Sequence, residues 1–88
     1  MKEKDLEKIF KALANKRRLA IIRYLKKGKR ATVGSIASHI KLSFKSTSKH
    51  LNILFSVDIV DREQKDLQKF YFLVNPVPDL IKHLLTIL

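Results

Sequence analysis

The sequence predicts a mainly α-helical fold that carries one small β-hairpin. Apolar residues recur at helical spacing in several short segments, capping residues precede those segments, and two β-rich runs follow one another late in the chain. With 88 residues the chain has room for a single domain, expected to span residues 1–88. A domain this small buries little apolar surface, so a partner chain would add to its stability.

Two helices are expected at the N-terminal end. Apolar positions at helical spacing predict an amphipathic first helix over residues 4–14. Asn15 is a favourable N-cap for a second helix over residues 16–27, and Gly28 is expected to end that helix. A short extended segment over residues 29–33 follows.

A helix-turn-helix is expected over about residues 33–56. Thr32 is predicted to cap the third helix, and Ser43 is predicted to cap the fourth. The tight turn between the two helices falls on Lys41, and a second turn falls on Asp58, after the fourth helix. Asp tolerates a left-handed backbone moderately and Lys less so, so the sequence leaves the standard geometry of these turns open while keeping the helix-turn-helix motif.

A hairpin and a last helix complete the predicted order. Two β-rich runs, at residues 59–64 and 69–74, predict a hairpin over about residues 59–74. Asp79 is expected to cap a last helix over residues 79–88. The order helix, helix, strand, helix, helix, hairpin, helix is that of a winged helix-turn-helix domain, with the hairpin as the wing.

The charge of the chain indicates a polyanionic partner. The formal net charge is +11, and residues 1–30 carry twelve basic but only three acidic side chains. Residues 31–57 add three lysines and no acidic residue. Positive charge concentrated in the first two thirds of a chain is typical of a nucleic-acid-binding face, and a generally basic, solvated surface is the alternative.

Residues that would support several other functions are missing. The absence of cysteine excludes disulfides, cysteine-ligated metal sites and thiol nucleophiles. No run of 18 apolar residues and no signal peptide occur, so we expect no membrane partner and a cytoplasmic protein. With two glycines and no paired carboxylates, the chain is not expected to be an enzyme or to bind a cofactor.

The predicted fourth helix has one face suited to the major groove of DNA. At about 100° per residue, one arc is expected to pack on the second and third helices. This arc contains Thr47, His50, Leu51 and Leu54. The opposite arc carries hydroxyl, ammonium and amide groups, which bind phosphates and base edges. These groups belong to Lys45, Ser48, Lys49 and Asn52. An ordinary solvated helix face is the alternative.

Residues 9–73 resemble the ArsR-type winged helix-turn-helix transcriptional repressors. The family's entry pattern is similar to Leu-Ala-Asn-Lys-Arg-Arg-Leu at residues 13–19, and its third helix begins much like Val-Gly-Ser-Ile-Ala at residues 33–37. Its recognition-helix signature resembles residues 42–54, with a Leu-Ser pair, spaced hydroxyls and a His-Leu pair. Its aromatic strand looks like Phe-Tyr-Phe-Leu at residues 70–73.

The resemblance implies a dimeric repressor that binds double-stranded DNA. By match of position, the DNA-contacting role falls on Ser43, Lys45, Ser46, Ser48 and Lys49. Asn52 joins them from the exposed arc, while Phe44 would either contact a thymine methyl group or pack on a neighbouring helix. The wing would contribute Arg62, Lys65 and Lys69, in a field weakened by the acidic residues beside them.

The first and last helices would form the homodimer interface that the resemblance implies. Their apolar residues are Leu6, Ile9, Phe10, Leu13, Leu80, Ile81, Leu84, Leu85 and Leu88. The alternative is that these side chains only complete the core of one protomer.

Metal sensing, which many members of the family perform, is not expected here. The start of the third helix, at residues 31–34, offers no ligand, and the last helix offers only Asp79 and His83. His50 is expected to be a packed, hydrogen-bonded histidine, and His39 to lie at a solvated helix end.

Two other function classes remain open at this stage. The charge alone would also suit a nonspecific, architectural protein that coats nucleic acid. Exposed apolar residues on the fourth helix, among them Phe44, Ile53 and Phe55, would suit a winged helix that docks on a protein partner.

Overall fold

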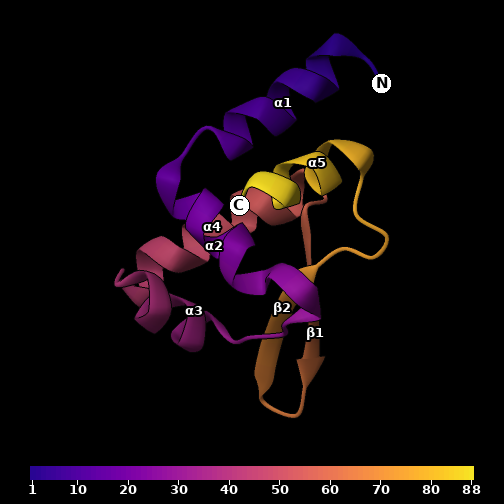
Figure 1. Ribbon diagram of the computed structural model, residues 1–88. Helices are drawn as coiled ribbons and strands as arrows, with labels where there is room; N and C mark the ends of the chain where they lie inside the picture. The colour runs from indigo at the N-terminus through magenta and orange to yellow at the C-terminus, as the bar shows by residue number, and fades with distance from the viewer.

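The computed structural model describes all residues, 1–88, and consists of a body of helices and one two-stranded antiparallel hairpin (Figure 1). The elements in chain order are α1 (Glu3–Leu13), α2 (Lys16–Leu25), the short 3-10 turn η1 (Lys26–Gly28), α3 (Val33–Ile40), α4 (Phe44–Ser56), β1 (Val60–Lys65), β2 (Gln68–Leu73) and α5 (Asp79–Ile87). This order confirms the predicted winged helix-turn-helix fold. In Figure 1, α1 extends away from the body of the molecule, and the hairpin projects from its opposite side.

Three of the four predicted caps are confirmed. The Asn15 side chain accepts hydrogen bonds from the backbone N–H groups of Arg17 and Arg18, at 2.9 and 3.1 Å. Thr32 accepts one from the Ser35 N–H at 3.2 Å, and Ser43 accepts one from the Ser46 N–H at 3.1 Å. Each cap satisfies a backbone donor that the first helical turn leaves without an intrahelical partner.

Two predicted helix ends are wrong. Asp79 does not cap α5, because Pro78 occupies the cap position and Asp79 is the first helical residue, where its charge still favours the positive end of the helix dipole. The second helix stops at Leu25, two residues before the predicted end. Lys27 and Gly28 both have left-handed backbones, with φ of 67° and 76°, and such residues cannot continue a right-handed helix.

The turns on either side of α4 keep their geometry without glycine. Lys41 ends α3 with φ of 57°, and its N–H donates to the Ala37 carbonyl. Asp58, which follows α4, has φ of 59°. A left-handed backbone costs roughly 1–2 kcal/mol at Lys41 and less at Asp58, because Asp tolerates this conformation better, so packing elsewhere offsets the strain at Lys41.

The core lies where α2, α3, α4, the hairpin and α5 meet. Its most completely buried side chains are Ile21, Ile22, Leu25, Ile36, Leu51, Leu54, Ile59 and Ile81. The segment before α3 joins the sheet through Ala31, which exchanges two backbone hydrogen bonds with Tyr71, at 3.0 and 2.7 Å. These contacts hold the wing beside α3 and α4.

Thr47 lies on the buried arc of α4, fully inaccessible to solvent, and its hydroxyl has no hydrogen-bond partner. A buried hydroxyl without a partner loses its hydration and gains nothing in return. Thr47→Val keeps the shape of the side chain and removes that polar group. We expect it to raise the free energy of unfolding by about 1 kcal/mol, or the melting temperature by about 4–8 °C, measured by thermal and urea unfolding.

Thr32→Val is the matched control, because there the hydroxyl caps α3 through Ser35. It should destabilise the protein by about 1 kcal/mol. A Thr47→Val protein that melts below the wild type would show that the Thr47 hydroxyl has a stabilising partner.

Candidate nucleic-acid interface

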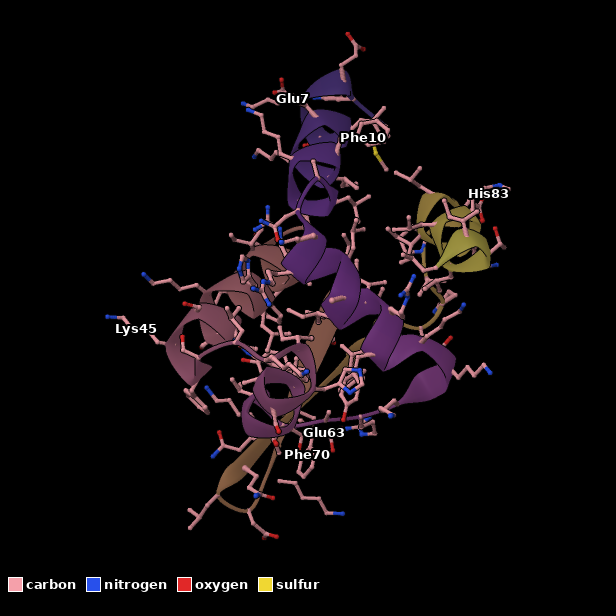
Figure 2. All side chains as sticks on the ribbon, turned by 60° about the vertical axis from the view of Figure 1, so that its left-hand side comes forward. Glu7, Phe10, Lys45, Glu63, Phe70 and His83 are labelled. Atoms are coloured by element: carbon pink, nitrogen blue, oxygen red, sulfur yellow. The ribbon has the colours of Figure 1, made fainter.

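The N-terminal half of α4 presents polar side chains to solvent. Lys45, Lys49 and Asn52 are exposed on the arc that the helical wheel assigned to them; Ser48, on the same arc, and Ser46, beside it, are half-buried. Lys45 extends away from the rest of the molecule (Figure 2). No acidic residue lies within α4, so this face combines positive charge with the positive end of the helix dipole.

The first residue of α4, Phe44, has 64% of its surface exposed. It does not pack into the core, which leaves its ring free to contact a base or sugar. Phe55, near the other end of the helix, is half-buried and packs against the core.

The register of the hairpin gives the wing two chemically different faces. Paired residues of an antiparallel sheet share a face, and faces alternate along each strand. The pairs Arg62–Tyr71 and Gln64–Lys69 therefore lie on one face. This face is turned toward α4, because the Arg62 guanidinium lies 4.1 Å from the centre of the Phe55 ring.

The acidic residues of β1 lie on the opposite face of the wing. Asp61 pairs with Phe72, and Glu63 pairs with Phe70. Glu63 also forms an ion pair with Arg30 at 3.2 Å, which reduces its field further. These two acidic residues therefore weaken the positive field of the α4-facing side less than the sequence suggested.

The three basic residues predicted for the wing have different surroundings. Arg62 is half-buried between the wing and α4, stacked on Phe55 and 3.5 Å from the Asn52 amide oxygen. Lys69 lies on the α4-facing side, paired with Gln64. Lys65 belongs to the other face and lies next to the hairpin turn. Of the three, only Lys69 faces the cleft between wing and α4.

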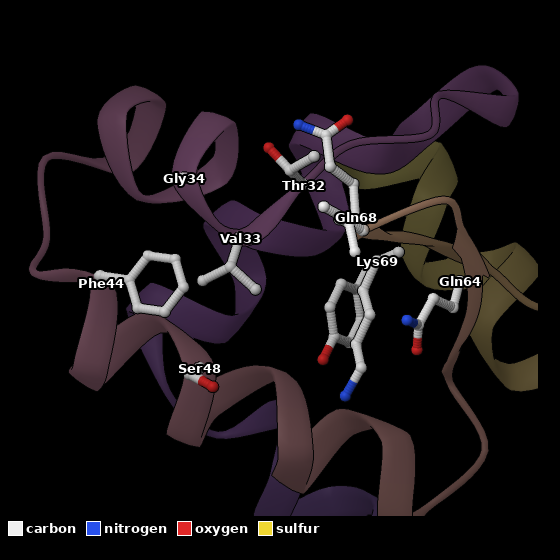
Figure 3. A pocket seen from close by; sticks show the side chains of 10 residues that line it. Thr32, Val33, Gly34, Phe44, Ser48, Gln64, Gln68 and Lys69 are labelled. Atoms are coloured by element: carbon white, nitrogen blue, oxygen red, sulfur yellow. The ribbon is translucent and has the colours of Figure 1, made fainter.

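This cleft has a volume of about 550 Å³ and is open to solvent (Figure 3). Its walls come from the start of α3, the first half of α4, and the hairpin. The lining residues are Thr32, Val33, Gly34, Phe44, Ser48, Gln64, Leu67, Gln68, Lys69 and Tyr71. The lining contains one cation and no carboxylate. Of the lining residues, the sequence analysis predicted only Phe44, Ser48 and Lys69 as site residues. Because side chains two apart on a strand share a face, Lys69 could also have indicated Tyr71.

Arg18, near the start of α2, makes contacts with distant segments that the residue pattern did not predict. Its guanidinium donates to the main-chain carbonyls of Lys11 and Ala12 at the end of α1, and lies 3.1 Å from Nδ1 of His50 on α4. Arg17 donates to the Ile40 carbonyl at the end of α3, at 2.9 Å. The start of α2 therefore joins α1, α3 and α4 through charged hydrogen bonds.

His50 is the packed, hydrogen-bonded histidine that the sequence predicted. Because a guanidinium only donates, Nδ1 of His50 accepts the hydrogen bond and the ring is neutral. Partial burial, with smaller contributions from the positive charges of Arg18 and Arg17, lowers the pKa of His50 below its ordinary value of 6.5.

This lowered pKa makes folding sensitive to mild acid. Well above pH 6.5 His50 is neutral in both states; as the pH falls through 6.5, the unfolded chain binds the proton more readily than the folded chain. The free energy of unfolding should therefore fall as pH drops from about 7 toward 5.5, and His50→Gln should reduce this loss. His39→Gln, at an exposed position, is the control for urea unfolding across that range. Equal pH dependence in wild type and His50→Gln would contradict the prediction.

An apolar groove of about 660 Å³ lies between α1 and α5. Phe10 on α1 and His83 on α5 both line it, and Figure 2 shows the two helices facing each other at this point. The other predicted interface residues that line it are Leu13, Leu80 and Leu84. Phe10 and Ile87 are 52% and 78% exposed and line the same groove, so they form part of one apolar patch rather than isolated exposed positions.

Not every residue predicted for the interface is free to reach a partner. Ile81 is only 1% exposed and belongs to the core of the protomer. Ile9, Leu85 and Leu88 are half-buried and also pack against that core. Leu6 is half-buried on α1. Ile87, which the sequence analysis did not single out, lines the groove.

The remaining histidines and acidic residues do not gather. The exposed His39 has its ring 4.3 Å from that of Tyr24. No group of three or more histidine, cysteine, aspartate or glutamate residues is placed to hold a metal ion. No helix is both long and apolar enough to span a bilayer.

Comparison with known proteins gives consistent matches. Residues 15–62 match the profile described as bacterial regulatory protein, arsR family. The transcriptional repressor SdpR of Bacillus subtilis (strain 168) is 36% identical over 70 residues, covering 80% of this chain and 76% of that protein.

Solved structures agree with the fold as well. HlyU from Vibrio cholerae N16961 is 27% identical, with a TM-score of 0.81 over 97% of this chain and 88% of that one. The homodimeric winged helix-turn-helix DNA-binding domain Mb0332 from Mycobacterium bovis is 25% identical, with a TM-score of 0.80 over 96% and 74%. The transcriptional repressor PagR of Bacillus anthracis is 25% identical, with a TM-score of 0.78 over 96% and 92%.

Proposed function

The chain belongs to the ArsR family of bacterial regulatory proteins, and we propose that it binds DNA as a homodimer, with α4 of each protomer in successive major grooves. It is a DNA-binding transcriptional regulator. The observation that carries the proposed docking is the exposed face of α4, which has hydroxyl, ammonium and amide groups and no acidic residue. Such a face matches the phosphates and base edges of a major groove.

The proposed contacts divide into positioning and base-reading groups. Lys45 and Lys49 are exposed and would neutralise phosphates or contact guanine edges. Ser43, Ser46 and Ser48 would bind backbone oxygens or base edges at the start of the helix. Phe44 would contact a thymine methyl group, and Asn52 would pair with adenine. From the wing, Lys65 and Lys69 would contact the flanking backbone, and Arg62, stacked on Phe55, would hold the wing beside α4.

The dimer is proposed from the groove between α1 and α5. Each protomer exposes Phe10 and Ile87 there, and a two-fold axis would bury both. The similar Mycobacterium bovis domain is homodimeric, which supports the assignment. Dimerisation also compensates for the small core of an 88-residue chain.

The proposed action is repression from the bacterial nucleoid in the cytoplasm. A dimer that covers its site on DNA blocks polymerase without any further contact, and the similar SdpR and PagR are named as repressors. In this function the chain needs no catalysed reaction, metal or cofactor, and residues 1–88 act as a single DNA-binding domain.

Asn52→Ala tests the proposed reading face. The Arg62 contact to its amide oxygen, at 3.5 Å, is at the limit of a hydrogen bond, so this amide is available to a base. We expect the variant to lose about 1–3 kcal/mol of discrimination at one A·T pair of the binding site, with little change on random DNA. Fluorescence anisotropy on single-substituted duplexes measures this.

Ser56→Ala is the matched control, at an exposed position at the opposite end of α4. It should leave the discrimination profile intact. If Asn52→Ala shows the same profile as wild type at every base pair, Asn52 does not read the sequence.

A further inference from the structure

We propose that the cleft between α4 and the wing binds one phosphate of the DNA backbone, through Lys69, the Tyr71 hydroxyl and the backbone N–H groups that begin α3. This inference rests on the proposed docking of α4. A helix in a major groove and a wing in the adjacent minor groove lie on either side of one strand's backbone. That backbone must then pass between them, where the cleft of about 550 Å³ lies.

The position of the Tyr71 hydroxyl indicates that the cleft binds a ligand. Its side chain is only 3% exposed and belongs to the core, yet it lines the cleft. Its hydroxyl donates to no group of the chain, and it is not among the polar atoms sealed from solvent. Because the core holds the ring in place and the Tyr71 hydroxyl is accessible only from the cleft, this hydroxyl can donate a hydrogen bond to a group that enters the cleft.

The start of α3 supplies further donors. Thr32 caps the helix by accepting from Ser35, and the N–H groups of Val33 and Gly34 form no intrahelical hydrogen bond. A Cβ placed on Gly34 would meet only the Thr32 hydroxyl, at 3.9 Å, so the backbone there is open to a ligand. Free N–H groups and the positive end of the helix dipole favour an anion.

The charge of the lining agrees with an anionic ligand. Lys69 is its only ionic side chain, and the amides of Gln64 and Gln68 add neutral donors. Figure 3 shows Lys69 and Gln64, from the wing, across the cleft from Phe44 and Ser48 of α4. The acidic Asp61 and Glu63 lie on the other face of the hairpin.

A phosphoryl anion could come from DNA or from a free phosphate. We assign it to the DNA backbone, because the cleft is bordered by α4 and the wing, the two elements proposed to bind DNA. Phe44 and Leu67 lie at its edges, on α4 and the wing tip, are 64% and 97% exposed, and would face the same duplex in the proposed docking.

Tyr71→Phe is the variant that tests this site, because it removes the hydroxyl and keeps the ring that packs in the core. We would measure, by fluorescence anisotropy, how tightly wild type and variant bind a series of duplexes. Each duplex has one backbone phosphate replaced by a neutral methylphosphonate, at a different position in each. We expect one position in each half-site to weaken wild type about tenfold. At that position Tyr71→Phe should show a much smaller penalty. On the unmodified duplex the variant should bind about tenfold more weakly, with an unchanged salt slope, whereas Lys69→Gln should lower the slope by about 1.

Tyr24→Phe, at a half-buried tyrosine outside the cleft, is the control and should match wild type throughout. Equal penalties in wild type and Tyr71→Phe at every methylphosphonate position, with both proteins folded by thermal unfolding, would overturn the inference. A second result would also overturn the inference. If inorganic phosphate at constant ionic strength competes with DNA for wild type but not for Tyr71→Phe, the cleft binds free small anions rather than the DNA backbone. Failure of the wild type to bind any duplex would instead refute the proposed function and this site with it.

Discussion

Replacing Lys45 and Lys49 together by alanine is expected to weaken binding to every duplex about 25-fold at about 0.15 M salt. Both side chains are exposed on a helix face with no acidic residue, so each is placed to neutralise a phosphate. Each phosphate contact releases counterions and contributes about 0.9 to the slope of log affinity against log salt, which amounts to about fivefold per contact at this salt concentration.

The salt dependence separates this effect from misfolding. The double variant should show a slope about 1.8 smaller than wild type, on specific and random duplexes alike. A variant with Lys2 and Lys4 replaced by alanine loses the same charge at the start of α1, and it should keep the wild-type slope. Equal losses in the two variants would show that general positive charge, rather than the α4 face, binds the DNA.

Phe10→Glu is expected to convert the dimer to monomers. The variant should then bind a palindromic duplex with two half-sites no more tightly than a duplex with one half-site. The Phe10 ring is 52% exposed in the protomer and lines the groove between α1 and α5. In a dimer the new carboxylate would be buried among apolar side chains, at a cost that exceeds the gain from association. In a monomer it would remain in water, so the fold should persist.

Sedimentation and DNA binding both report this change. Wild type should sediment as a dimer and bind a two-half-site duplex at least about 10³-fold more tightly than random DNA. Phe10→Glu should sediment as a monomer and bind full and half-sites alike. Leu67→Glu places the same charge on a leucine that is 97% exposed at the wing tip, and it should remain dimeric. A Phe10→Glu protein that still sediments as a dimer would place the interface elsewhere.

Local features of this fold could be predicted because their causes lie within a few residues. The caps at Asn15, Thr32 and Ser43 each bind a backbone N–H two or three residues ahead. The hairpin is likewise set by two adjacent runs and a short polar turn. The cap assigned to Asp79 was wrong because Pro78 takes that position, so the acidic side chain enters the first turn instead.

Contacts between distant segments could not be read from residue patterns. Arg18 and His50 are 32 positions apart, and they meet only because α2 packs against α4. The strand register, which places Glu63 away from α4 and Lys69 toward it, depends on which face of the hairpin the core covers. The cleft beside Tyr71 combines α3, α4 and the wing, so it exists only in the assembled fold.

Selection of bound sequences from a random duplex pool, followed by anisotropy across a salt series, tests sequence-specific binding by a dimer most directly. We expect enrichment of a palindrome whose half-sites lie about one helical turn apart, bound about 10³-fold or more above random DNA. A steep salt dependence with no enriched sequence would contradict this and indicate nonspecific coating of nucleic acid. Absence of duplex binding near physiological salt would contradict both specific DNA binding and nonspecific coating. The exposed apolar residues of α4 would then be the surface to test for a protein partner.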